Sequence, residues 1–296
     1  MDGILSVNKE AGYTSNDVIA VLRGILRMKK IGHTGTLDPG ATGVLPVCLG
    51  KATKAAELLT AAEKEYEAEL VFGFETDTQD LSGKVTRSGA YVFSESRFQE
   101  AVRELTGEIW QTPPMYSALK IGGVRLYDLA REGKEVERQP RRIRIEEIQV
   151  KSLNEKGARI RVRCSKGTYI RTLVEDLGRK TGYLACMTSL CRLRSGPFVL
   201  EESLRLEEIQ RLRQEGRLEE KILPIDRMFE QLPSYRIRQE QEKRLQNGNS
   251  LVVELPGLPC GEKVRIYDSA GQFAALYEAG TLENGTVCCK AYKMFR

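Results

Sequence analysis

Two stretches of alternating residues place the strongest constraint on what this chain can fold into. RRIRIEEIQVKSL spans residues 141–153 and RIRVRCS spans 159–165, with the polar turn NEKG before the second run. Alternate residues of a strand point to opposite faces, so two such runs joined by a turn predict a β-hairpin. The second run has an apolar face, Ile160, Val162 and Cys164, and a basic face that we call the arginine row, Arg159, Arg161 and Arg163.

Positive charge is concentrated around this hairpin. The whole chain carries a formal net charge of +5, but residues 134–194 hold 16 Lys/Arg and 7 Asp/Glu, a net of +9. Such a concentration is typical of proteins that bind a polyanion. A solvated charged face is the alternative, although an ordered arginine row suits a phosphate backbone better than it suits solubility alone.

Helix signals accompany the strand signals. Residues 14–28 are expected to be helical, because Thr14 and Asp17 resemble a capping box. The apolar stripe of this helix is expected to be Val18, Val21, Leu22, Ile25 and Leu26. Residues 96–107 predict a second helix, with Ser96 as its N-cap.

The length of 296 residues favours two domains over one. A predicted helix over 168–182 ends at a glycine. After about residue 232 the sequence pattern changes to short strands separated by Gly, Pro and Asn turns. We therefore expect a larger mixed α and β domain over 1–232 and a small all-β domain over 233–296.

The sequence indicates a cytoplasmic protein with no membrane partner. The start, MDGILSVNKEAG, lacks the basic and then apolar pattern of a signal peptide. Apolar runs such as GVLPVCLG are too short to span a bilayer. The seven cysteines are odd in number and lack a framework-like spacing, which indicates reduced thiols.

The motifs of several common chemistries are missing. Gly35 and Gly40 have the spacing of a phosphate-binding loop, but Ala41 stands where that loop needs a lysine. One histidine and no C-x-x-C motif leave no zinc signature, and no G-x-S-x-G elbow accompanies His33. Carboxylates, tyrosines and arginines remain as candidates for chemistry.

The best of these candidates is Asp38, within KIGHTGTLDPGATGVLP at residues 30–46. Asp-Pro and Pro-Gly pairs favour turns, so a plain turn residue is the alternative. The four glycines of the segment let its backbone approach a ligand closely, and the flanking helix and apolar run can fix it on a scaffold. That context favours a functional carboxylate.

The segment GHTGTLDPGATGVLPVCLGKATK closely resembles the signature of the bacterial tRNA pseudouridine synthase B family, which isomerises uridine 55 in the T-loop of tRNA. LSVNKEAGYTS, EKEYEAEL, FETDTQDLSGKV and CSKGTYIRTLVEDLG resemble further family segments in the same order, although Glu10 stands where the family has proline. The resemblance covers most of 1–232. It implies an α+β pseudouridine synthase fold with a largely antiparallel central sheet, and more weakly a C-terminal, PUA-like RNA-binding β-domain.

The resemblance implies that Asp38 is the catalytic aspartate and Arg171 its partner. An arginine beside a carboxylate favours the ionised form and fixes its direction. Tyr66 and Tyr169 are implied to line the base pocket, where a ring stacks on an extruded uracil and a phenol donates a hydrogen bond or carries a proton. Without the resemblance, a surface arginine and two half-buried core tyrosines are the plain interpretations.

Four further residues match family positions. Leu190 is expected to contact the base, and His33 to hold the opened loop. Lys9 and Asp80 are expected to support the structure or orientation of the site. A core leucine and a loop histidine bound to a backbone carbonyl are the alternatives for the first two.

The implied reaction involves no oxidation and no group transfer, so neither a cofactor nor a metal is expected. The expected partner is tRNA, bound by a monomer without a guide RNA. Two alternatives stay open, a non-catalytic RNA-binding or RNA-folding factor and a guide-RNA-dependent pseudouridine synthase. The joint presence of Asp38, Tyr66, Tyr169 and Arg171 speaks against the first, and the compact first 30 residues and the absence of a long basic tail argue against the second.

Overall fold

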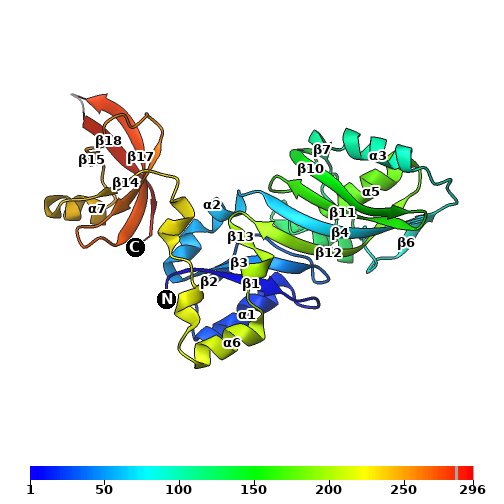
Figure 1. Ribbon diagram of the computed structural model, residues 1–296, viewed down its shortest axis with the longest axis horizontal. Coiled ribbons are helices and arrows are strands. Elements are labelled where there is room, and N and C mark those ends of the chain that lie inside the picture. Colours follow the sequence, from blue (N-terminus) through cyan, green and yellow to red (C-terminus); the bar gives the residue numbers. More distant parts are fainter. Residues whose placement is uncertain (284–285, 296) are drawn as a thin grey trace.

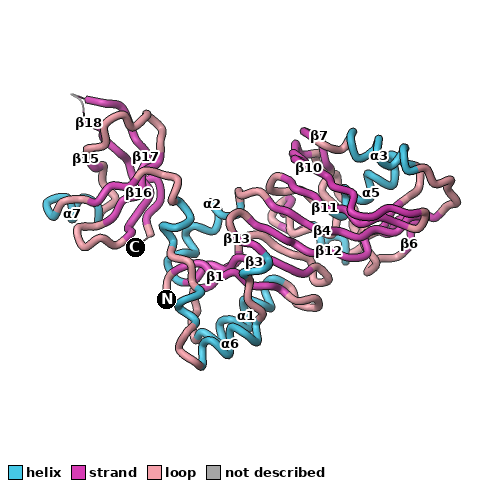
Figure 2. The backbone as a smooth tube through the Cα atoms, in the orientation of Figure 1, coloured by secondary structure: helices cyan, strands magenta, loops and turns pink. Residues whose placement is uncertain are grey.

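A nine-stranded sheet dominates the computed structural model, which describes residues 1–283 and 286–295 (Figures 1 and 2). Its strands run in the order β1-β3-β12-β4-β11-β10-β7, with β2 added beside β3 and β13 beside β12. The bounds are β1 Gly3–Lys9, β2 Ile31–His33, β3 Thr42–Leu49, β4 Lys64–Phe72, β7 Gly107–Gln111, β10 Arg141–Asn154, β11 Gly157–Cys164, β12 Ala185–Ser195 and β13 Phe198–Val199. Two small hairpins accompany it, β5 Phe74–Thr76 with β6 Val85–Ser88, and β8 Lys120–Ile121 with β9 Val124–Arg125.

This sheet is antiparallel except at one seam. Within the described residues, β3 and β12 form its one parallel pair, and β10 and β11 form the predicted hairpin. The expected mixed α and β class with a largely antiparallel central sheet is therefore confirmed.

Helices cover the sheet in two groups (Figure 1). Helices α3 and α5 contact each other and pack against strands of the sheet's centre, whereas α1 and α6 pack together beside β1 and β2. The α-helices are α1 Ser15–Leu26, α2 Ala56–Thr60, α3 Glu95–Glu104, α4 Leu126–Arg131, α5 Ile170–Thr181, α6 Leu206–Gln214 and α7 Glu242–Gln246. The 3₁₀ helices are η1 Gly50–Ala55, η2 Leu200–Glu202, η3 Leu218–Lys221, η4 Ile225–Phe229 and η5 Gln239–Gln241.

A second, five-stranded sheet follows in the order β14-β16-β17-β18-β15. Its strands are β14 Ser234–Arg236, β15 Leu251–Val253, β16 Lys263–Tyr267, β17 Phe273–Glu283 and β18 Thr286–Met294. It has its own apolar core, and it also packs on the first sheet. Leu276 and Phe295 belong to one buried cluster with Ile4 and Val44, and the Phe295 ring lies 6.2 Å from that of Phe229.

The helix predictions are right in type and partly wrong in detail. The capping box of Thr14 and Asp17 is present, but Val21 is exposed and Ile19 is buried in its place. The cap of α3 is Ser94, whose side chain accepts from the Arg97 backbone, so the prediction of Ser96 is wrong. Both Ser94 and Ser96 precede apolar positions, and sequence spacing alone does not distinguish them.

The arginine row does not form a free phosphate track. As predicted, Ile160, Val162 and Cys164 are fully buried. The arginines alternate with them and meet glutamates of the neighbouring strands, in the pairs Arg159–Glu69, Arg161–Glu65 at 2.6 Å and Arg163–Glu147 at 3.9 Å. The row therefore lies on the sheet face opposite to Val162, and its charge is matched by carboxylates from β4 and β10.

Candidate active site

A rigid loop between β2 and β3 carries Asp38. The Leu37 N–H donates to the Ser15 hydroxyl at 2.9 Å, which ties the loop to the start of α1. The Thr34 N–H donates to the Pro46 carbonyl at 3.0 Å. The Ala41 N–H donates to the carbonyl of Asp38 at 3.1 Å, which closes a β-turn. Asp38 is thus a turn residue, as its sequence predicts, and its side chain is still presented from a fixed backbone.

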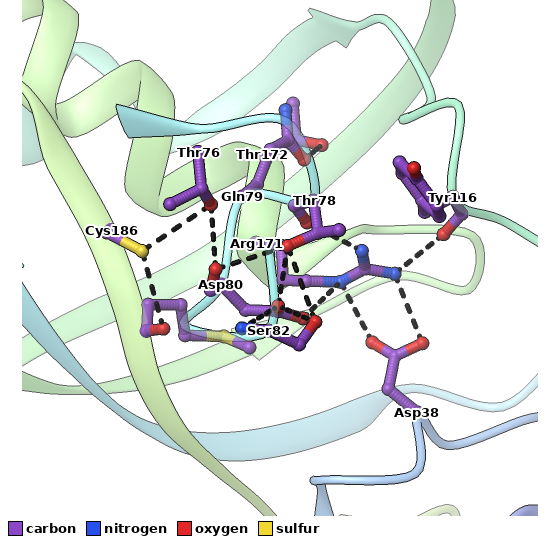
Figure 3. Close-up of polar contacts among 11 residues, drawn as sticks. Asp38, Thr76, Thr78, Gln79, Asp80, Ser82, Tyr116, Arg171, Thr172 and Cys186 are labelled. Carbon is purple, nitrogen blue, oxygen red and sulfur yellow. Dashed lines mark hydrogen bonds and ion pairs between the residues drawn. The ribbon is translucent and has the colours of Figure 1, made fainter. Parts of the chain in front are cut away.

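Arg171 grips the Asp38 carboxylate with two nitrogens. Its Nε lies 2.9 Å from one oxygen and its Nη2 3.1 Å from the other (Figure 3). The Arg171 side chain is 5% exposed, whereas that of Asp38 is 37% exposed. A two-point contact fixes both the direction and the rotation of a carboxylate, and the exposed part of Asp38 is open to a ligand.

The protein backbone holds Arg171 in turn. Its guanidinium donates to the carbonyls of Thr78 and Tyr116, each at 2.8 Å (Figure 3). Asp80 lies behind it, with one carboxylate oxygen 3.9 Å from the arginine Nε. The other oxygen of Asp80 accepts from the Thr78 hydroxyl at 2.7 Å and from the backbone and hydroxyl of Ser82 at 3.0 and 2.5 Å. The predicted supporting residue thus shapes the turn that orients Arg171.

The start of α5 positions Arg171 and Tyr169 together. Tyr169 is the N-cap of this helix. The Gln111 side chain binds it on both sides, accepting from the Tyr169 N–H at 2.8 Å and donating to the Tyr169 carbonyl at 3.1 Å. Burial raises the pKa of the Tyr169 phenol, so the ring is neutral and can donate a hydrogen bond.

Tyr66 and Leu190 lie on neighbouring strands of the central sheet, on the same face. Tyr66 in β4 is opposite Val162 of β11, and Leu190 in β12 is opposite Ala68 of β4. Directly opposed residues share a sheet face, so both side chains point to the face away from the arginine row. Burial raises the pKa of Tyr66, which is 8% exposed.

His33 and Lys9 are the last residues of two strands of the central sheet, β2 and β1. His33 ends β2, and burial, followed by the Arg192 guanidinium, lowers its pKa. Lys9 is fully buried and donates to the carbonyls of Glu10, Tyr13 and Pro39 at 3.0, 2.6 and 3.2 Å. Burial lowers the Lys9 pKa to about 8. The carbonyl of Glu10 still serves Lys9, although this residue replaces the family's proline.

Sequence reasoning missed Arg192. It lies two residues after Leu190 on β12, is 1% exposed and faces the same side as Tyr66, its cross-strand partner. The sequence signal that could have found it is its spacing, because residues two apart in a strand share a face and Leu190 was already a candidate. Instead, Arg192 was counted only as one of the positive charges in the basic segment 134–194.

Two negative findings apply to the described ranges 1–283 and 286–295. No group of three or more His, Cys, Asp or Glu side chains is arranged to hold a metal ion. No helix there is long and apolar enough to cross a membrane.

Family models match most of the chain. The model described as TruB family pseudouridylate synthase (N terminal domain) matches residues 23–170, and that of the tRNA pseudouridylate synthase B C-terminal domain matches 171–230. The chain is 43% identical to tRNA pseudouridine synthase B of Bacillus licheniformis, over 93% of this chain and 92% of that protein. It is 44% identical to tRNA pseudouridine synthase B of Lachnoclostridium phytofermentans over the full length of both.

Solved structures of proteins with similar sequences have a similar fold. One chain from a crystal structure of a Cbf5-Nop10-Gar1 complex matches with a TM-score of 0.75 and 28% identity, covering 99% of this chain and 85% of that one. Another, from an H/ACA RNP bound to a substrate RNA containing 2'-deoxyuridine, matches with a TM-score of 0.73 and 27% identity, at the same coverage.

Proposed function

The chain belongs to the TruB family of pseudouridylate synthases, and we propose that it converts uridine 55 in the T-loop of tRNA to pseudouridine. The reaction breaks the bond between N1 of uracil and C1′ of the ribose. A bond from C5 to C1′ replaces it, while C5 loses a proton and N1 gains one. Product and substrate are isomers, so the chemistry calls for neither a cofactor nor a metal.

The observation that carries this proposal is the Asp38 carboxylate, fixed at two points by a buried arginine yet partly open to solvent. Three roles fit this geometry. Asp38 can stabilise positive charge that develops at C1′, attack C1′, or take a proton from C2′. Each role requires an ionised carboxylate, which the Arg171 guanidinium favours, and a fixed direction of approach.

We assign the base pocket to Tyr66, Tyr169 and Leu190. A stacked uridine has to leave the folded loop before Asp38 reaches its sugar, which costs a few kcal/mol. A tyrosine ring and the Leu190 side chain offer flat and apolar surface to the extruded base. His33, at the rim of the Asp38 loop, is placed to contact the loop that the base has left.

The partner, in this proposal, is tRNA alone, bound by a cytoplasmic monomer without a guide RNA. We also propose the division into a catalytic domain over 1–232 and a PUA-like RNA-binding domain over 233–296. Two facts support this division: the five-stranded sheet takes its strands from residue 234 onward, and the family models end at residue 230.

The test is to incubate the purified protein with an unmodified tRNA transcript and to map pseudouridine by position. The expected result is one product site, in the T-loop, without added RNA. A transcript with cytidine at the target position is the matched control and is expected to stay unmodified. Product that appears only after a guide RNA is added favours the guide-dependent alternative, and tight binding without any product favours the non-catalytic one.

A further inference from the structure

Arg192 is the largest fully buried side chain among the described residues. No carboxylate of the described chain lies within ion-pair distance of it. Its Nε donates to the Val44 carbonyl at 2.7 Å and its Nη2 to the Gly35 carbonyl at 3.2 Å. A buried guanidinium that two carbonyls hold, with no opposite charge, is unfavourable for stability alone, so its place in the site calls for a functional reason.

The two carbonyls stand on either side of the Asp38 loop. Gly35 precedes the turn and Val44 follows it, so the guanidinium bridges the neck of the loop. The backbone of Arg192 pairs with Gly43 at the parallel seam. Gly43 has a φ of +101°, and a Cβ there would stand 2.3 Å from the Arg192 carbonyl oxygen. One residue of β12 therefore fixes the loop through both its side chain and its backbone.

The same guanidinium stands beside two other residues of the site. Arg192 is directly opposite Tyr66 across β12 and β4, on one face of the sheet. Burial raises the pKa of Tyr66, and the positive charge of Arg192 opposes that rise. For His33, burial lowers the pKa and Arg192 lowers it further. The charge of Arg192 thus acts on both Tyr66 and His33.

We infer that Arg192 is a positioning residue for the isomerisation, one that sets the separation between the Asp38 loop and Tyr66. This inference rests on the function proposed above. Arg192 itself is too deeply buried to touch the RNA, so it acts through the neck of the loop and through Tyr66. The planar guanidinium fixes the directions in which it donates to the two carbonyls, whereas a lysine ammonium keeps the charge without that fixed fork.

The test compares Arg192→Lys and Arg192→Met with the matched control Arg194→Met. Arg194 lies two residues along the same strand, but its side chain is 55% exposed and lies 3.8 Å from Glu65. Single-turnover rates and tRNA dissociation constants are measured separately. We expect dissociation constants within about threefold of wild type for all three variants, because Arg192 is buried and the Arg194 guanidinium lies beside the carboxylate of Glu65. Rates should fall by roughly 10²-fold for Arg192→Lys and further for Arg192→Met, and stay unchanged for the control.

A second measurement detects the effect of the Arg192 charge on the pKa of His33. The chain has one histidine, so an NMR titration of labelled imidazole reports His33 alone. The His33 pKa should rise in Arg192→Met and hold its value in Arg192→Lys and Arg194→Met. A nonspecific disturbance of the fold would not raise the His33 pKa in Arg192→Met while leaving it unchanged in Arg192→Lys.

The outcomes separate the two proposals. A wild-type protein that makes no pseudouridine contradicts the proposed function and not the placement of Arg192. With an active wild type, an Arg192→Lys variant at full speed overturns the positioning role, as does a slow rate that arises entirely from weak tRNA binding. If Arg192→Met does not fold, Arg192→Lys decides the question. If neither folds, Arg192 is a structural residue and the inference is wrong.

Discussion

At the scale of single residues, the cations of the site are buried, whereas its aspartate is partly exposed. The Arg171 side chain is 5% exposed and Lys9 and Arg192 are 1% exposed or less, while the Asp38 carboxylate that Arg171 binds is 37% exposed. The cations are therefore fixed by carbonyl groups before any substrate arrives, and Asp38 is the charged group left accessible. Such preorganisation removes the need for the site to rearrange when charge develops on the substrate.

His33 gives a prediction for the dependence of stability on pH. Burial and Arg192 hold its folded pKa below the ordinary value of 6.5. As the pH falls through 6.5, the unfolded chain binds a proton at His33 and the folded chain does not. The free energy of unfolding should therefore decrease as the pH falls below about 6.5. Above that pH, His33 is neutral in both states and should not change the stability.

The measurement is urea unfolding of wild type and His33→Gln at pH 7.5 and pH 5.5. Wild type should lose more stability between the two values than the variant, since the variant has no imidazole to protonate. An equal loss in the two proteins would contradict the assigned direction of the pKa shift.

At the scale of elements, the seam between β3 and β12 is the point where the Asp38 loop joins the sheet. We predict that Gly43→Ala lowers the free energy of unfolding by at least about 2 kcal/mol, because it combines a positive φ with a clash against backbone. Gly40→Ala in the same loop is the control. A Cβ at Gly40 meets nothing within 4 Å, so we expect a change within about 0.5 kcal/mol.

Thermal and urea unfolding of the two variants decide this prediction. If Gly43→Ala is as stable as Gly40→Ala, then the seam is not a rigid anchor for the loop.

Local sequence signals predicted the helices and strands well where the pattern of residues is typical of one local structure. The capping box at Thr14, the hairpin of β10 and β11, and the left-handed Gly182 at the end of α5 are such cases. Where two neighbours carry the same signal, as Ser94 and Ser96 do, tertiary packing decides between them.

The site was predictable only in part, for a similar reason. Asp38 and Arg171 were paired through resemblance, and their distance follows from the order of strands, which pattern alone does not give. The role of Arg192 depends on which carbonyls it reaches. That depends on the parallel seam, which has no signature in the sequence.

At the scale of the whole molecule, the two faces of the central sheet have separate uses. One face carries Tyr66, Leu190 and Arg192, and the other carries the arginine row with its glutamate partners. The sequence showed where positive charge is dense, but not that β4 supplies opposing carboxylates. The positive charge of the arginine row is therefore opposed by glutamates within the structure itself.

We predict that replacing the arginine row, Arg159→Gln, Arg161→Gln and Arg163→Gln together, changes tRNA affinity by less than about threefold. The slope of the logarithm of affinity against the logarithm of salt should also stay unchanged. If the row instead contacts three phosphates, the slope should become less steep by about two to three units, and affinity should fall at low salt. Binding titrations at several salt concentrations distinguish the two results.

The most direct measurement of the central claim uses Asp38→Asn with unmodified tRNA transcript. Asparagine keeps the shape of the side chain and removes its negative charge. tRNA binding and pseudouridine formation are measured in the same sample under single-turnover conditions. We predict a dissociation constant within about threefold of wild type and a rate lower by roughly 10⁴-fold or below detection. Pseudouridine formed at a rate near that of wild type would contradict the claim that the Asp38 carboxylate performs the reaction.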